Sequence, residues 1–347
     1  MSLEIEIKNP LDDDQWDNLI IETNQYSFFH SHSWIKVLRE SYGYTPYFFI
    51  LRNQGKFSAL LPFMEVNSRY SGRRGVSLPF SDYCDPIIRG EISLQRLLER
   101  TTVFGKTYNW KYLDMHGGEI LFQDKNSSRE YYGHLLELNA QPDNILKRFR
   151  DSNRRSIRKA VKSGVEIHQS NSLHSMQEFH RLHCLTRKRH KLPAQPFQFF
   201  KKIHEHIISK KSGFIVKAIY NDKIIGAAVF FHFGKKAMFK FGASDLRYQY
   251  LRMNNLIMWE AIRWYANNGY ESFCFGRTDM ENVGLRQFKQ GWGAKEYVIK
   301  YFKYDLKTDS IIKHNTDHMD FIIHLIFSKM PISISRILGA LMYRHFA

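Results

Sequence analysis

The sequence predicts an α/β protein made of two similar domains with mixed central sheets, followed by C-terminal helices. Its 347 residues exceed what one hydrophobic core normally serves. A composition of 43% hydrophobic and 15% aromatic residues supplies two packed cores and argues against disorder. The same order of strands and helices also occurs twice, roughly 165 positions apart. We expect an N-terminal domain over residues 1–150, a C-terminal domain over 151–305 and a helical tail over 306–347.

Each copy of the repeat begins with a β-hairpin. Two apolar runs are joined by a short polar turn, Asn53–Lys56 in the first half and Asn221–Lys223 in the second. Apolar runs joined by Asn, Asp or Gly turns are the usual signature of a hairpin. A helix and a further strand follow in both halves. The helices are expected over residues 94–103 and 254–267, and the strands over 110–115 and 271–275.

The end of the second of these strands is the expected active cleft. Apolar residues 273–275 run into a polar loop, a short basic helix and a Gly-Trp-Gly stop, and another strand is expected over residues 296–304. Polar groups at the end of a buried strand usually belong to a site, because a rigid sheet positions the loop that carries them.

A basic helical stretch over residues 144–163 separates the two copies. Its residues Arg150, Arg154, Arg158 and Lys162 recur every four positions and therefore share one face. Like charges at this spacing repel, so the row either binds an anion or is a solvated face. Both interpretations remain open.

The formal charge of +17 favours an anionic partner. A pyrophosphate-bearing cofactor, RNA, an anionic membrane face and a polyprenyl diphosphate glycan all fit, and so does a basic surface that only aids solubility. Three widely spaced cysteines without a CxxC pair are typical of a reducing compartment. We find no secretory signal and no run of 18 apolar residues, and therefore expect a cytoplasmic protein without a spanning helix.

Five stretches in order resemble the FemABX-like aminoacyltransferases and their relatives, which are built from two GNAT-type acyltransferase folds in tandem. These stretches are residues 77–86, 154–165, 179–189, 254–262, and 275–278 together with 284–294. The resemblance implies an enzyme that transfers an acyl or aminoacyl group to an amine or hydroxyl of a cell-envelope precursor. A lipid-linked glycan, a peptidoglycan precursor or an exopolysaccharide component would be the acceptor.

The chain departs from the family's pattern in two places. Residues 186–208 leave no room for the long helical hairpin of the bridge-forming members, and the glycine-rich pyrophosphate loop is replaced by residues 247–255. Side-chain charge on arginine can substitute for backbone donors in binding a diphosphate. Acyl-CoA and aminoacyl-tRNA both remain open as donors, and no metal is expected. The expected donor-binding residues are Arg247, Arg252, Asn254 and Asn255.

Acyl transfer requires a base, an oxyanion donor and a dry site. Within the resemblance, Asp279 is the expected general base, Thr278 or the loop amides contact the oxyanion, and Arg277 and Lys289 hold the negative part of a substrate. The alternative for Asp279 is the N-cap of the short helix after it.

The expected acceptor contacts in the first half are Asp82 and Tyr83, with Arg154 as a further substrate contact. A tight turn built on Ser and Asp side chains is the alternative for the segment around Asp82. No basic partner of Cys84 is visible, so it is not the expected nucleophile.

The run Phe29–Trp34 lacks the further ligands that a metal would need, so a helix start capped by serine is expected there, with Lys36 as an acceptor contact.

Pro331 divides the tail into two short helices. They either lie on an anionic membrane with Lys329, Arg336 and Arg344 toward the lipid, or pack on the second domain. The sequence therefore predicts a cytoplasmic acyltransferase that can be peripheral on the inner face of the membrane. The rival from another class is a non-catalytic protein that binds an anionic glycan or a nucleic acid such as tRNA. The oligomeric state is not predicted.

Overall fold

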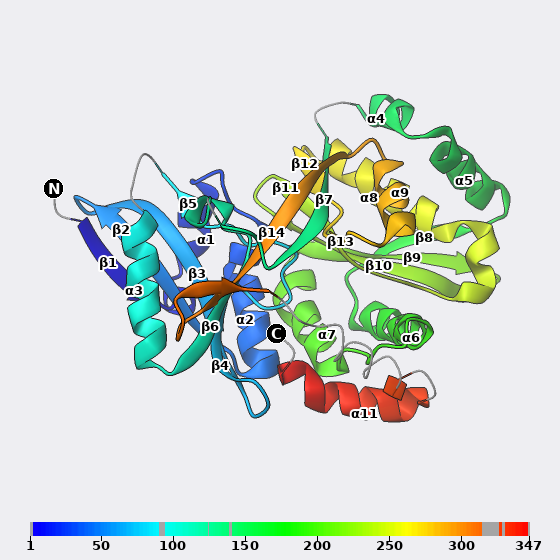
Figure 1. Ribbon diagram of the computed structural model, residues 1–347. Helices are drawn as coiled ribbons and strands as arrows, with labels where there is room; N and C mark the ends of the chain where they lie inside the picture. The colour runs from blue at the N-terminus through cyan, green and yellow to red at the C-terminus, as the bar shows by residue number, and fades with distance from the viewer. Residues whose placement is uncertain are drawn as a thin grey trace. The chain divides into compact units, whose positions relative to one another are not determined.

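The computed structural model describes residues 3–89, 94–123, 125–138, 141–313, 326–327 and 330–345 (Figure 1). The chain forms two compact units, each assembled from segments far apart in the sequence. Unit 1 is Met1–Tyr131, Val298–Asn315 and Met342–Ala347, and unit 2 is Tyr132–Tyr297 and Thr316–Leu341. The domain boundaries expected at residues 150 and 305 remain a prediction.

Unit 1 contains a mixed sheet with helices packed against it. The strands, in the order of the sheet, are β1 (Leu3–Lys8), β2 (Thr45–Asn53), β3 (Lys56–Ser68), β4 (Gly72–Val76), β6 (Trp110–His116) and β14 (Lys295–Asp305). Two short strands, β5 (Ile87–Ile88) and β15 (Ser310–Ile312), pair with β3 and β14. The helices are α1 (Trp16–Ile21), α2 (His32–Tyr42) and α3 (Leu94–Thr107), with 3-10 turns at Pro10–Asp12, Phe28–His30, Glu119–Leu121 and Tyr343–His345.

A strand from the far end of the chain completes this sheet. β14 pairs antiparallel with β6, so that Tyr301 lies opposite His116 and Asp305 opposite Tyr112. Phe302 is fully buried in the hydrophobic core of unit 1, where its ring lies 5.0 Å from that of Phe122. The core of unit 1 is therefore incomplete without residues that follow Tyr132–Tyr297, the first segment of unit 2, in the sequence.

Unit 2 has a second mixed sheet. Its strands run in the order β7 (Arg129–Glu137), β12 (Ser272–Cys274), β11 (Lys236–Ser244), β10 (Lys223–Phe233), β9 (Gly213–Tyr220) and β8 (Glu166–Ser170). The short strand β13 (Thr278–Asp279) follows β12 in the chain. The helices are α4 (Pro142–Arg148), α5 (Asp151–Lys162), α6 (Leu173–Arg189), α7 (Phe197–Ile203), α8 (Met253–Asn267), α9 (Val283–Gln290) and α11 (Ile332–Met342). Shorter turns are η4 (His204–Ile208) and η5 (Leu246–Leu251).

The predicted repeat is confirmed by the topology of the two sheets. In unit 1, the antiparallel strands β2, β3 and β4 are followed by α3 and then by β6, which is parallel to β4. In unit 2, β9, β10 and β11 are followed by α8 and then by β12, which is parallel to β11. The predicted fold class, two α/β units with mixed sheets, is therefore correct.

The two hairpin turns have the same backbone conformation. Gln54 and Gly55 have φ of 51° and 76°, and Asn221 and Asp222 have φ of 48° and 58°. Two successive positive φ values define the type I′ turn, whose twist matches that of the flanking strands. Asn, Asp and Gly tolerate this conformation best, which is why these residue types made the hairpins visible in the sequence.

The tail is described in part. The helix expected before Pro331 lies largely outside the described residues, whereas α11 follows Pro331 as predicted. No helix of the described residues has the length and apolar character needed to cross a bilayer.

Candidate active site

The two central strands of unit 2 separate after a short shared ladder. β11 pairs with β12 only through Lys236–Met238, opposite Ser272–Cys274, although β11 continues to Ser244 and stays paired with β10 over that length. β10 also carries an irregularity at Val229 and Phe230 where it faces β11. Beyond Met238, β12 no longer pairs with this edge of β11. An extended ligand can add to such a strand edge.

The chain that leaves β12 is held in place by a buried lysine. Lys289, on α9, is only 3% exposed, and its Nζ donates to the carbonyl oxygens of Gly276 and Arg277, both at 2.9 Å. Gly276 has φ of 70°, a conformation that favours glycine. Lys289 was expected to contact substrate, and this geometry adds a second role, since it fixes the loop that the sequence singled out.

Thr278 and Asp279 follow on β13 and differ in their surroundings. Thr278 is 1% exposed, and its Oγ1 is buried without a hydrogen-bond partner among the described residues. Asp279 is exposed. The alternative interpretation of Asp279 as the N-cap of α9 is wrong, because Asn282 occupies that position and its Oδ1 accepts from the backbone N–H of Leu285 at 3.1 Å. Arg277 is half-buried on the same loop.

A buried histidine that the sequence analysis missed lies on β7 of unit 2. The carbonyl oxygen of His134 accepts from the backbone N–H of Phe275 at 3.0 Å, directly after β12. The imidazole is fully buried, and its Nε2 lies 3.0 Å from Oε2 of Glu296. Glu296 also accepts from Arg286, at 2.9 and 2.7 Å, and from Gln290 at 3.0 Å.

The surroundings of His134 favour one tautomer. Glu296 is a carboxylate whose pKa is lowered, chiefly by its hydrogen bond with Arg286, so Nε2 of His134 donates to it. Burial, together with the nearby Lys289 ammonium, lowers the pKa of His134. The ring is thus neutral near pH 7, with an unprotonated Nδ1 that has no hydrogen-bond partner among the described residues. An oriented neutral imidazole with a free lone pair can act as a general base.

The predicted donor-binding residues gather at the beginning of α8. Arg252, with φ of 60°, precedes the helix and supplies no side-chain cap. The Nδ2 of Asn254 donates to Oγ of Ser244 at the end of β11, at 3.4 Å. Asn255 donates to Oδ1 of Asn153 on α5, also at 3.4 Å. The structure therefore brings the beginning of this helix next to the end of β11.

The remaining predicted cations of unit 2 form local ion pairs. Arg247, on η5, pairs with Asp245 at 2.6 Å, and its side chain is 80% exposed. Arg154, on α5, pairs with Asp151 one turn earlier. Both guanidinium groups face solvent at least in part, so an anionic ligand can reach them.

The predicted acceptor contacts Asp82, Tyr83 and Lys36 belong to unit 1 and are described within it. The carbonyl oxygen of Asp82 accepts from the Tyr301 hydroxyl at 2.7 Å. Tyr83 packs edge-on against Phe29, with ring centroids 6.4 Å apart. Lys36 is half-buried on α2.

Two expectations for the beginning of unit 1 are resolved by the structure. Ser31 caps α2 as predicted, since its Oγ accepts from the Trp34 N–H at 3.3 Å. Cys84 does have a basic neighbour, His30, whose Nε2 lies 3.4 Å from the sulfur. Burial nevertheless raises the pKa of the Cys84 thiol well above its usual range, which disfavours the thiolate.

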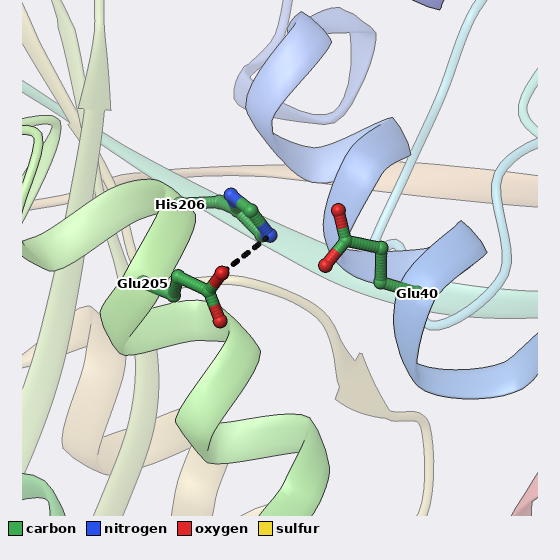
Figure 2. Close-up of side chains that lie close together, drawn as sticks. All are labelled: Glu40, Glu205 and His206. Carbon is green, nitrogen blue, oxygen red and sulfur yellow. Dashed lines mark ion pairs between the residues drawn. The ribbon is translucent and has the colours of Figure 1, made fainter.

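Among the residues that the structure describes, neither unit taken alone offers three clustered metal ligands. Figure 2 shows Glu205 and His206, neighbours on η4 whose side chains form an ion pair of 3.9 Å. They offer two ligands within unit 2, and Glu40, also drawn there, belongs to α2 of unit 1. A structural or catalytic metal normally requires at least three protein ligands.

Residues 147–290, all within unit 2, match the family described as acetyltransferase (GNAT) domain. Unit 2 is similar to such a domain over these residues. The match confirms the predicted GNAT resemblance and the prediction of a transferase. No curated protein matches the sequence.

Solved structures share the fold of both units. FemX is 13% identical, covers 89% of this chain and 98% of its own, and has a TM-score of 0.70. The C-terminal domain of a putative lysylphosphatidylglycerol synthetase from Agrobacterium fabrum is 14% identical, with coverages of 96% and 97% and a TM-score of 0.58. A tandem GNAT protein from the clavulanic acid biosynthesis pathway is 10% identical, with coverages of 88% and 99% and a TM-score of 0.57. The tandem GNAT fold is thereby confirmed, and the chain resembles FemX in fold.

Proposed function

We propose that this protein transfers an acyl or aminoacyl group to an amine or hydroxyl of a cell-envelope or exopolysaccharide precursor. The observation that supports this most is the separation of β11 from β12 after Met238. An extended acyl donor can pair with the open edge of β11 as an added strand would. Its reactive carbonyl then lies toward the loop that follows β12, where Thr278 and the loop amides are candidates for the oxyanion contact.

The beginning of α8 would hold the anionic part of the donor. Helix N-termini bind phosphate because their first N–H groups have no partner within the helix. Arg252 and the amides of Asn254 and Asn255 add side-chain donors there, and the exposed Arg247 adds charge. This arrangement suits the diphosphate of acyl-CoA and equally the terminal phosphates of aminoacyl-tRNA, so either donor class fits.

The reaction needs a base for the acceptor amine. The amine nitrogen forms a bond to the donor carbonyl carbon, the bond from that carbon to the leaving group breaks, and the proton lost by the amine passes to the base and then to the leaving group. Two side chains can accept this proton. One is Asp279, which is exposed, and the other is His134, whose free Nδ1 is oriented by the bond to Glu296. Arg277 would hold a negative group of the substrate.

The acceptor is proposed to be anionic and lipid-linked. The net charge of +17 favours an anion, and one solved relative is named for the synthesis of an aminoacylated phospholipid. Asp82, Tyr83, Lys36 and Arg154 are the proposed acceptor contacts. The proposed location is the cytoplasm, at the inner face of the membrane where such acceptors are available.

A thermal-shift screen of the full chain with acetyl-CoA, CoA and charged tRNA tests the donor. A ligand that binds only the folded state raises the melting temperature by mass action. We expect one donor class to raise it and the same donor to supply label to an amine acceptor. If donors or anionic glycans bind but the unaltered chain transfers nothing, the rival non-catalytic binding protein is favoured instead.

Single substitutions identify the base. Removing a general base lowers kcat by about 10²- to 10⁴-fold. If His134 is the base, His134→Gln loses activity to this extent and Asp279→Asn does not, and the reverse pattern assigns the role to Asp279. Asp143→Asn, an exposed carboxylate on α4, is the matched control and keeps full activity.

The pH profile separates a base from a merely structural histidine. Because burial lowers the pKa of His134, a reaction that uses it loses kcat/KM only as pH falls below 6.5, the ordinary value for imidazole. Residual activity of His134→Gln should lack this acid limb. A profile that keeps the limb would exclude His134 as its origin.

A further inference from the structure

One face of α11 is apolar and exposed. Ile334, Ile337 and Leu341 are 47%, 64% and 63% exposed. Their spacing of three and four residues places them on a single face of the helix. The opposite face is packed: Ser335 and Gly339 are buried, and a Cβ on Gly339 would lie 2.1 Å from the carbonyl oxygen of Ala194. The helix is thus docked on unit 2 by one side and leaves large apolar side chains uncovered on the other.

The charge around this face is positive. Residues 321–347 contain no Asp or Glu, whereas Arg336 and Arg344 are exposed on the described part of this segment. Arg336 forms no ion pair with a described residue. An apolar face whose own segment carries basic and no acidic residues complements a surface that is both apolar and anionic.

The inner side of α11 borders a cavity of about 600 Å³. Three arginines line it, Arg181, Arg247 and Arg336, together with the apolar residues Leu185, Phe197 and Ile332. None of the lining residues is acidic. Glu178 and Asp245 pair with Arg181 and Arg247 from outside this set, so Arg336 supplies the charge that no described carboxylate neutralises.

The histidine in the cavity wall adds no compensating charge. His180 is 5% exposed, and its Nε2 lies 3.0 Å from the carbonyl oxygen of Gln195, to which it donates. Burial lowers its pKa, and the nearby Arg336 contributes in the same direction. The cavity therefore presents a cation beside an apolar wall, which suits the head of an anionic amphiphile. Its volume is within the usual range for small-molecule sites.

We propose that α11 seats unit 2 on an anionic phospholipid bilayer, with Ile334, Ile337 and Leu341 in the headgroup layer and a lipid phosphate bound at Arg336 in the cavity. A guanidinium can donate two parallel hydrogen bonds to phosphate oxygens, and Ile332, one turn from Arg336 on the same side of the helix, faces the apolar part of the lipid. One face of α11 thus enters the headgroup layer, and the opposite face binds the phosphate of a lipid. This inference stands without acyl transfer, since it concerns binding alone.

Vesicle cosedimentation of the full chain tests the surface. Vesicles of phosphatidylcholine are compared with vesicles that also contain phosphatidylglycerol, and we expect binding only to the latter. The triple variant Ile334→Gln, Ile337→Gln, Leu341→Gln should bind at least about tenfold more weakly. Val103→Gln, an equally exposed apolar residue on α3 of unit 1, is the matched control. Equal binding of both vesicle types, or undiminished binding by the triple variant, would overturn the proposal.

Short-chain phosphatidylglycerol, used below its micelle concentration, tests the cavity separately. We expect it to raise the melting temperature of the protein, inorganic phosphate to do so much less, and Arg336→Gln to abolish the effect. The control Arg100→Gln removes the same charge from exposed α3 and should change nothing. If inorganic phosphate raises the melting temperature as much as the lipid does, the cavity is only an anion site. If the lipid raises the melting temperatures of Arg336→Gln and Arg100→Gln equally, Arg336 does not bind it.

A labelling experiment covers the case in which the triple variant fails to fold. All three native cysteines are buried, so an introduced Ile337→Cys can be labelled with an environment-sensitive fluorophore. We expect its emission to shift to shorter wavelength on anionic vesicles and to stay unchanged with tRNA. A Val103→Cys label is the control. A shift with tRNA and none with vesicles would show that the exposed face serves a nucleic acid instead.

Discussion

Shortening Phe302 to alanine should unfold unit 1 preferentially, although residue 302 follows residues 132–297 of unit 2 in the sequence. The ring is fully buried, lies 5.0 Å from that of Phe122 and belongs to the same core as Leu113 and Trp110. It sits on β14, which pairs with β6 through Tyr301–Asp305. Losing it removes apolar contacts from the centre of the unit and leaves a cavity.

The expected magnitude is large relative to the stability of the unit. Phe→Ala substitutions in cores cost about 3–5 kcal/mol, and a domain is stable by about 5–15 kcal/mol in total. Phe302→Ala should therefore consume a major fraction of the free energy of unfolding of unit 1. Val298→Ala on the same strand, where the side chain is 45% exposed, should change it by less than about 1 kcal/mol.

Hydrogen exchange followed by mass spectrometry locates the effect. Amides of β2, β3 and β6 should exchange much faster in Phe302→Ala than in the unaltered chain, while β9 and β10 keep most of their protection. Urea unfolding supplies the free energy. If protection is lost mainly in β9 and β10, or if the loss of stability stays under about 1 kcal/mol, then β14 does not complete the core of unit 1 and our description of that unit is incorrect.

His183 is buried on α6 and its pKa is lowered well below 6.5 by burial, so below pH 6.5 the unfolded chain binds a proton that the folded chain does not. As pH decreases below 6.5, the free energy of unfolding should decrease by up to about 1.4 kcal/mol per pH unit for this group. His183→Leu should flatten this pH dependence in urea titrations, whereas the exposed His174→Leu should not. Asn282→Ala should cost about 1 kcal/mol through loss of the α9 cap, while Asp279→Ala costs little stability, as measured by thermal unfolding. Gly75→Ala should destabilise unit 1 by about 1–3 kcal/mol in urea, because its Cβ would lie 2.3 Å from the Trp110 ring.

Local signals in the sequence account for the part of the fold that was predicted. The hairpins were visible because the type I′ turn selects Asn, Asp and Gly, as at Asn221 and Gly55. The strand, loop and helix around Thr278 were visible because an apolar run gives way to polar residues at one point. These features depend on neighbours a few positions apart, which is the range over which residue patterns are informative.

The pairing of distant strands gave no such signal. His134 and Glu296 lie 162 positions apart, and they meet only because the fold brings β7 and β14 together. Neither residue type is unusual in a strand, so nothing local marked them. Similarly, Asp279 and Asn282 are both good caps, and only the backbone of α9 decides that Asn282 accepts the hydrogen bond.

β7 and β14 connect the candidate chemistry to the folding of the whole chain. Each strand passes from one unit to the other, at residues 131 and 132 in β7 and at 297 and 298 in β14. His134 and Glu296 lie on the parts of these strands that belong to unit 2, and Phe302 lies farther along β14 in the core of unit 1. The carboxylate that orients the candidate base is therefore on the same strand as a core residue of the other unit. A fragment that ends before residue 295 lacks both Glu296 and Phe302. It should therefore lose the His134–Glu296 pair and the strands β14 and β15 of unit 1, even if the rest of the segment that resembles a GNAT domain is present.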